Sequence, residues 1–147
     1  MSTARDAEER AESRPPFRIL PRLSEETEFF WTAGSRGHLE FLRCGDCGYF
    51  VHPPYPRCPR CLSKSLAPAA VSGRARVAGY TINYHPWIPG FDPPYVFAVV
   101  EMPEQEGLRM FTNIVNCRPE DVRVGMEVEV VFEHNGDVWL PLFQPSP

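Results

Sequence analysis

The residues best suited to chemistry are two pairs of cysteines with the same internal spacing. Cys44 and Cys47 form one CxxC unit, Cys58 and Cys61 form a second, and ten residues separate the two units. Each unit can wrap a tight turn around one cation, and four soft sulfur ligands in a tetrahedral array suit zinc. Because such a site leaves no coordination position for water or substrate, the spacing predicts a structural zinc ion rather than a reactive one.

Two other uses of the four cysteines remain open at this point. Disulfides are one, but paired CxxC units in an intracellular chain favour a metal. Iron in a rubredoxin-like electron carrier is the other, although a redox protein gains little from the strand-rich segment that follows. The fifth cysteine, Cys117, is expected to be an ordinary thiol at the end of a strand.

Catalytic motifs are missing from the sequence. It contains no GxSxG elbow, no glycine-rich phosphate loop and no HExxH motif, and its four histidines are scattered. A nucleophile, a base and a group that orients the base are needed together for nucleophilic catalysis. We therefore predict no catalytic residue.

Large aromatic residues gather in two segments that could contact a partner. Ser24 can begin a helix of roughly residues 24–33, which Gly34 or Gly37 would end, and this helix carries Phe29, Phe30 and Trp31. The loop of residues 85–94 holds four prolines together with Trp87 and Phe91. Packing within the chain and docking on a partner explain the helical triplet equally well. For the loop an interface is favoured, because preordered exposed aromatics suit an interface anchor.

The second half of the chain reads as a series of strands. The pattern predicts five of them, with Gly79 permitting a bulge in the first, a helical turn at residues 119–121, and Asn135-Gly136 forming a hairpin turn before the last. The predicted strands are residues 74–84, 95–102, 108–115, 127–133 and 138–143. A shorter strand is expected at residues 38–43, and the small residues 67–73 read as a linker. Five strands with this spacing suggest an OB-like barrel in a mainly β protein.

The charge distribution bears on nucleic acids. The net charge is −4, and residues 36–76 hold seven basic and two acidic residues, so this middle carries +5 and the rest −9. Tyr80, Tyr84, Phe97 and Phe111 might stack bases on a barrel, but alternating strand aromatics usually belong to a core. The acidic barrel half would also repel a phosphate chain. The aromatic residues keep a nucleic-acid-binding module as the second hypothesis, although the charge disfavours it.

The domain organisation follows from these segments. We expect a flexible tail at residues 1–23, a helical segment at 24–37, a zinc ribbon at 38–66 and an OB fold at 67–147. The longest apolar run, residues 95–100, is far shorter than a membrane span. A cytoplasmic protein with no membrane partner is the expectation.

The ordered set of motifs resembles a known family, the zinc-ribbon and OB-fold acyl-CoA-associated proteins, also described as the domain of unknown function thirty-five. The resemblance extends from about residue 24 to 143. The residues that carry it are 28–31, 39–48, 53–54, 58–61, 72–73, 94–101 and 125–132.

The resemblance implies an N-terminal helical segment, a rubredoxin-like zinc ribbon and a C-terminal OB fold. Members of this family work beside thiolase-superfamily enzymes that act on acyl-CoA thioesters, and some accompany thiolase-like aldolases of bacterial steroid side-chain degradation. We therefore expect a noncatalytic accessory subunit that completes such an enzyme, with acyl-CoA at or near the interface. Candidate contacts are Phe29, Phe30, Trp31, Trp87 and Phe91, and Arg74 and Arg76 are candidates for the CoA phosphates.

Overall fold

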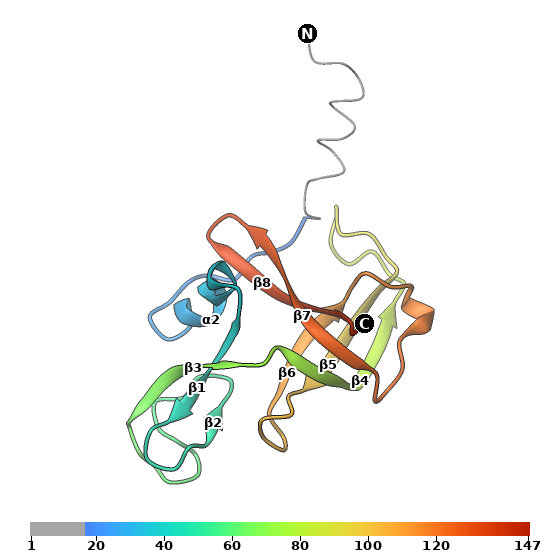
Figure 1. The fold of residues 1–147 in the computed structure, drawn as a ribbon. Helices are drawn as coiled ribbons and strands as arrows, with labels where there is room; N and C mark the ends of the chain where they lie inside the picture. The colour runs from blue at the N-terminus through green and yellow to red at the C-terminus, as the bar shows by residue number, and fades with distance from the viewer. Residues whose placement is uncertain (1–16) are drawn as a thin grey trace.

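The chain folds into a three-stranded sheet followed by a closed five-stranded barrel, as the computed structural model of residues 17–147 shows (Figure 1). The first part contains α2 (Glu28–Thr32), the 3-10 helix η1 (Ala33–Arg36), β1 (Leu39–Cys44), β2 (Phe50–Val51) and β3 (Leu66–Val71). The barrel contains β4 (Arg74–Asn83), β5 (Tyr95–Glu101), β6 (Arg109–Ile114), the 3-10 helix η2 (Pro119–Asp121), β7 (Glu127–Asn135) and β8 (Val138–Pro145). The mainly β architecture predicted from the sequence is confirmed.

The barrel strands follow the order β4-β5-β6-β8-β7, so the OB-type barrel is confirmed. The register of β4 against β5 shifts between Val77 and Gly79, as expected for the predicted bulge. Closure between β6 and β8 rests on one parallel pair, Ile114 with Phe143. Beside it the buried hydroxyl of Thr112 donates to the carbonyl of Pro141 at 3.0 Å, which adds a second link between the two strands.

The β7–β8 hairpin and the helical turn at residues 119–121 also agree with the sequence prediction. Asn135 pairs with Val138 at the end of β7 and β8, and Gly136 has φ of 58° in the connecting turn. The predicted helical turn is η2. Alternation along β7 is clear at Glu127, which is exposed, and Val128, which is buried, but residues 129–133 are half-buried on both faces.

The ribbon sheet is larger than the sequence suggested. β1 lies at its centre, with β2 on one side and β3 on the other. Residues 67–71 were expected to be a linker, yet they form most of β3 and pair with residues 39–43 of β1. The interpretation as a linker is wrong because Ala67, Pro68, Ala69 and Ala70 show no alternation, whereas backbone pairing with β1 makes them a strand.

The helical segment starts later than predicted. Ser24 does not cap it; the carbonyl of Ser24 accepts from the N–H of Glu28 in a turn, and α2 begins at Glu28. Gly37, with φ of 80°, ends η1 as expected. A Cβ on Gly34 would lie 2.5 Å from Cβ of Trp139 and 2.6 Å from the ring of Phe132, so this glycine lets η1 pack directly on the β7–β8 hairpin.

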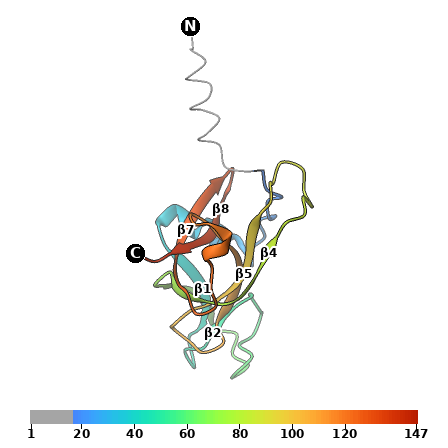
Figure 2. The same cartoon turned by 90° about the vertical axis from the view of Figure 1, so that its right-hand side faces the viewer.

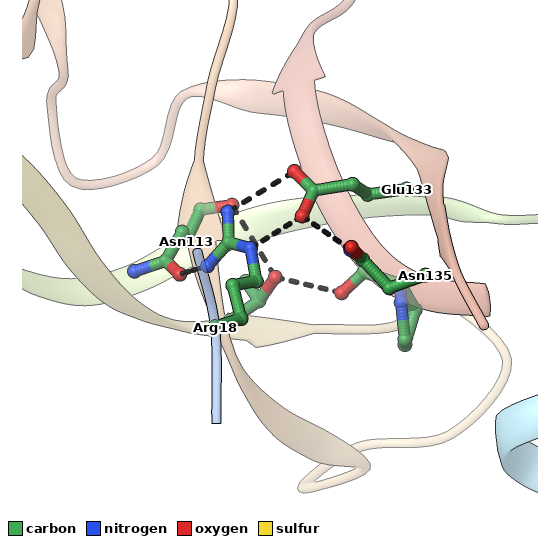
Figure 3. Close-up of polar contacts among 6 residues, drawn as sticks. Arg18, Asn113, Glu133 and Asn135 are labelled. Carbon is green, nitrogen blue, oxygen red and sulfur yellow. Dashed lines mark hydrogen bonds and ion pairs between the residues drawn. The ribbon is translucent and has the colours of Figure 1, made fainter. Parts of the chain in front are cut away.

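The predicted flexible tail needs correction at its end. Residues 1–16 lie outside the described residues, but Arg18 holds the following segment against the barrel (Figure 3). We call residues 17–21 the strap. It lies beside the loop between β4 and β5 (Figure 2). In the part of the chain that is described, no helix is long and apolar enough to cross a membrane.

Candidate metal centre and apolar groove

Two turns of the same construction present the four cysteines. The N–H of Gly48 donates to the carbonyl of Cys44 at 2.9 Å, and the N–H of Leu62 donates to the carbonyl of Cys58 at 2.8 Å. The residue after each CxxC unit has positive φ, 77° at Gly48 and 64° at Leu62. The sequence signals only the first of these positions, because leucine rarely adopts this conformation.

The four sulfur atoms lie where one tetrahedral ion would place them. All four Sγ atoms are within 4.8 Å of one another, with 3.6 Å between Cys44 and Cys61 and 3.6 Å between Cys47 and Cys58. Zinc with Zn–S bonds of about 2.3 Å requires sulfur atoms about 3.8 Å apart, whereas a disulfide requires about 2 Å. The cluster is therefore a structural zinc site, and the prediction of all four ligands as one cluster is confirmed.

Hydrogen bonds tune the thiols and join the two turns. The backbone N–H of Cys47 is the main cause that lowers the pKa of Cys44 to about 6. The hydroxyl of Ser63, beside the second turn, donates to the carboxylate of Asp46 in the first, and the N–H of Gly45 donates to the carbonyl of Ser65 at 2.7 Å. The two turns are thus fixed to each other by the protein as well as by the ion. Within residues 17–147 no second group of three or more His, Cys, Asp or Glu side chains lies close enough to bind a metal.

A second feature is an apolar groove of about 730 Å³ on the barrel. Its walls come from the strap, α2, the residues after β2, the β4–β5 loop, β5, β6 and β8. Representative lining residues are Leu20, Trp31, Phe91, Met110, Phe111 and Leu142. Segments far apart in the sequence therefore meet at one concave surface.

The groove brings together some of the predicted contact residues. Phe30, Trp31 and Phe91 all line it. Phe30 is only 6% exposed and packs on Phe41 and His52, so it belongs to the chain's own core and offers little surface to a partner. Phe29 and Trp31 are half-buried against the same core.

Trp87 does not line the groove but projects from the adjacent loop. Its side chain is 68% exposed, and its indole N–H donates to the side chain of Asn83 at 2.7 Å. The Asn83 amide in turn donates to the carbonyl of His85. Because its one polar atom is already bonded, Trp87 presents a fixed apolar face to its surroundings.

Arg74 and Arg76 lie elsewhere, in a depression on β4 that also contains Glu101, Glu127 and Glu129. Arg76 donates to Glu127 at 3.1 Å, and Arg74 faces Glu129 in the register of β4 and β7. These carboxylates offset the charge that would attract phosphate groups. The surroundings thus disfavour the suggested role in CoA binding.

Several residues in or near the groove lie differently from what the sequence predicted. Phe97 and Phe111 were expected to be core, but they are 46% and 69% exposed and stack with ring centroids 5.5 Å apart. Strand alternation did indicate their exposure, because the residues before and after Phe97 and Phe111 are buried on the opposite face. Tyr84, also expected in the core, is 69% exposed. Nothing in the sequence pointed to Arg18.

The fold and the four-sulfur site together define a zinc-ribbon and OB-fold protein. Comparison with known families agrees: residues 31–67 match the model described as "ChsH2, rubredoxin-like zinc ribbon domain", and residues 69–133 match "ChsH2, C-terminal OB-fold domain". The chain belongs to the DUF35 family, as its relatives also indicate.

One relative is a "DUF35 domain-containing scaffold protein" of Methanothermobacter thermautotrophicus, 36% identical over 99 residues that make up 66% of this chain and 73% of the relative. Another is the "3-oxo-4,17-pregnadiene-20-carboxyl-CoA hydratase alpha subunit" of Mycobacterium tuberculosis, 30% identical over 132 residues, or 90% of this chain and 42% of the relative. The chain thus spans less than half the length of the hydratase alpha subunits it matches.

Among solved structures, a chain of the "Ltp2-ChsH2(DUF35) aldolase" superposes with a TM-score of 0.77 and 33% sequence identity. The match covers 86% of this chain and 98% of that chain. Similarity therefore extends across both the ribbon and the barrel.

Proposed function

We propose that this chain is a noncatalytic accessory subunit of a thiolase-superfamily enzyme that acts on an acyl-CoA thioester, and that the enzyme is an aldolase of steroid side-chain degradation. The single observation that carries the proposal is the likeness to the DUF35 chain of the Ltp2-ChsH2 aldolase, which is covered almost to its full length. The name of the mycobacterial relative supports a steroid acyl-CoA as substrate. The zinc site supports the noncatalytic part, because four sulfur ligands leave the ion no position for substrate.

The physical basis is a division of labour between two chains. The partner enzyme provides the nucleophile or base and the oxyanion hole, whereas this chain orders partner loops and helps to close the acyl-CoA channel. Ordering reactants and excluding water lower the barrier without any bond-making group from this chain. The complex is cytoplasmic in this proposal, with acyl-CoA at or near the interface.

The contact surface that we propose is formed by Trp87 and Phe91 of the β4–β5 loop together with Phe29 and Trp31 of α2. Trp87 is its centre, because the ring is exposed and already fixed by Asn83. Buried tryptophans are the commonest large contributors to binding energy at interfaces. Arg74 and Arg76 are left out of this surface because of their carboxylate neighbours.

The test is co-purification of the tagged chain from its native host, followed by identification of the captured enzyme and an affinity measurement. Trp87→Ala combined with Phe91→Ala should weaken the complex by about 30-fold or more and leave the zinc content at one ion per chain. Tyr55→Ala, which removes an exposed aromatic ring from the ribbon, is the matched control. Unchanged affinity in the double variant would reject the surface, and turnover of an acyl-CoA thioester by the purified chain alone would reject the noncatalytic role.

A nucleic-acid-binding module is the second candidate, because Phe97 and Phe111 are exposed and stacked on adjacent barrel strands, as aromatic platforms for bases are. Charge disfavours it. Arg18, the one charged side chain among the described residues of the groove, is paired with Glu133, and Arg109 is paired with Glu101. A fluorescence titration with single-stranded DNA at moderate salt decides between the two: salt-sensitive micromolar binding supports this candidate, and no binding removes it.

A further inference from the structure

The apolar groove has the dimensions of a small-molecule site. Its volume of about 730 Å³ falls within the range of about 300 to 1,000 Å³ typical of ligand pockets. Walls from seven separate segments line it. Protein-binding surfaces are generally flatter, whereas concavity on this scale suits a ligand that is enclosed on several sides.

The wall formed by the strap is fixed before any ligand arrives (Figure 3). The guanidinium of Arg18 donates to both carboxylate oxygens of Glu133, at 2.6 and 3.3 Å, and to the side chain of Asn113 at 3.0 Å. It also lies 4.9 Å from the ring centroid of Phe91, which ties the strap to the β4–β5 loop. A preformed wall lowers the entropic cost of binding.

Most polar side chains of the groove are already hydrogen-bonded within the chain. Besides the indole of Trp31, five polar side chains line it: Arg18, Thr27, His52, Thr112 and Asn113. Thr27 contacts Ser24, Thr112 donates to the carbonyl of Pro141, and Asn113 donates to the carbonyl of Val96 while accepting from Arg18. Among the described residues a ligand therefore meets mainly hydrocarbon and aromatic rings and no unpaired charge, which favours an uncharged ligand.

An extended peptide is a poor occupant. To add a strand, a peptide needs an open backbone edge. The edge of β6 toward β8 is closed by the pairing of Ile114 with Phe143 and by the bond from Thr112 to Pro141. The rings of Phe97 and Phe111 instead stack on each other, inclined by 10°, and add exposed aromatic surface to the groove.

His52 is the groove side chain with a buried polar atom that has no partner. Its Nδ1 is buried and has no hydrogen-bond partner, and burial lowers its pKa to about 4, so the ring is neutral at pH 7. Leaving a lone pair on Nδ1 without a partner costs less free energy than leaving an N–H there without one. The favoured tautomer therefore carries its proton on the other ring nitrogen, Nε2. A neutral imidazole with its proton on Nε2 donates to a ligand oxygen such as a hydroxyl or a carbonyl.

We infer that the groove binds an uncharged, largely hydrocarbon small molecule that carries a hydroxyl or carbonyl oxygen. The site lies between the strap and the outer surface of β5, β6 and β8. This inference goes beyond the proposed accessory role and does not depend on it, since the isolated chain contains every wall described above.

The test uses the purified, zinc-loaded full chain and 1-pyrenemethanol, a planar uncharged probe with one hydroxyl, whose fluorescence band ratio reports an apolar environment. We expect saturable binding with a Kd of about 100 µM or tighter. The anionic analogue 1-pyrenesulfonate should bind at least about tenfold more weakly, because the groove residues that the structure describes offer no unpaired cation. Amide shifts in nitrogen-15 NMR spectra should map to the strap, β6 and β8.

Phe111→Ser should weaken 1-pyrenemethanol binding about tenfold, because it removes one exposed ring of the stacked pair without touching the core. Val124→Ser is the matched control, since Val124 is 67% exposed and does not line the groove. The inference is overturned if the wild-type chain shows no saturable binding, if both variants lose it equally, or if Phe111→Ser weakens only capture of the partner enzyme. Failure to capture any enzyme would contradict the proposed function and leave the inference about the groove unaffected.

Discussion

Gln105 and Phe50, fifty-five residues apart in the sequence, bond to each other twice. The side-chain oxygen of Gln105, in the β5–β6 loop, accepts from the N–H of Phe50 at 2.8 Å, and its amide nitrogen donates to the carbonyl of Phe50 at 3.0 Å. Gln105 thereby completes the free edge of β2 as a neighbouring strand would. The neighbouring Glu104 accepts from the N–H of Ser72 at 2.8 Å, so one barrel loop holds both the ribbon and the junction after it.

Gln105→Ala should destabilise the chain by about 2 kcal/mol, because it leaves a part-buried N–H and carbonyl of Phe50 without partners. Urea denaturation followed by circular dichroism measures the loss. Glu106→Ala, one residue further along the same loop, is an exposed control for which we expect a change within about 0.5 kcal/mol. Equal stabilities of the two variants would show that the loop does not hold the ribbon.

Gly34→Ala should destabilise the contact of η1 with the β7–β8 hairpin by about 2 kcal/mol or more. The added methyl group would lie 2.5 Å from Cβ of Trp139, and neither backbone can retreat without breaking the packing. Thermal unfolding gives the measurement. Gly79→Ala is the matched control, because its Cβ would meet Val99 at an ordinary 3.6 Å. The idea fails if Gly34→Ala melts at the wild-type temperature.

Local patterns in the sequence were enough to predict the barrel strands, the hairpin at Asn135-Gly136 and the zinc ligands. Each of these depends on neighbours in the chain: alternation, turn residues or ligand spacing. β3 escaped prediction because its residues gain strand structure only from pairing with β1. Arg18 and Gln105 escaped for the same reason, since their partners, Glu133 and Phe50, are far away in the sequence. Long-range polar contacts of this kind leave no periodic signal.

Removal of zinc should unfold the ribbon and leave much of the barrel folded. The ribbon strands are short, with only two residues in β2, so the ion supplies a large share of their stability. Nitrogen-15 NMR spectra recorded after treatment with a strong chelator should lose the dispersed signals of β1, β2 and β3 and keep those of β4 to β8. Cys47→Ser should lower the zinc content in the same way, whereas Cys117→Ser should keep one zinc ion per chain. Ribbon signals that persist without the metal would contradict a structural role for zinc.

Stability should depend on pH through His52. Its pKa is lowered from 6.5 to about 4 by burial among aromatic rings, with the ring centroid of Phe41 at 4.6 Å and that of Phe30 at 5.1 Å. Between pH 6.5 and pH 4, His52 is therefore protonated in the unfolded chain and neutral in the folded chain. The free energy of unfolding is highest above pH 6.5 and falls as the pH drops toward 4. The loss attributable to this group is about 3 kcal/mol, from about 1.4 kcal/mol per pKa unit.

His52→Phe keeps an aromatic ring in place and should flatten this part of the profile. Because acid also releases zinc, both proteins are compared by urea denaturation at each pH, and the difference between them isolates His52; parallel profiles would show that the imidazole is not the titrating group.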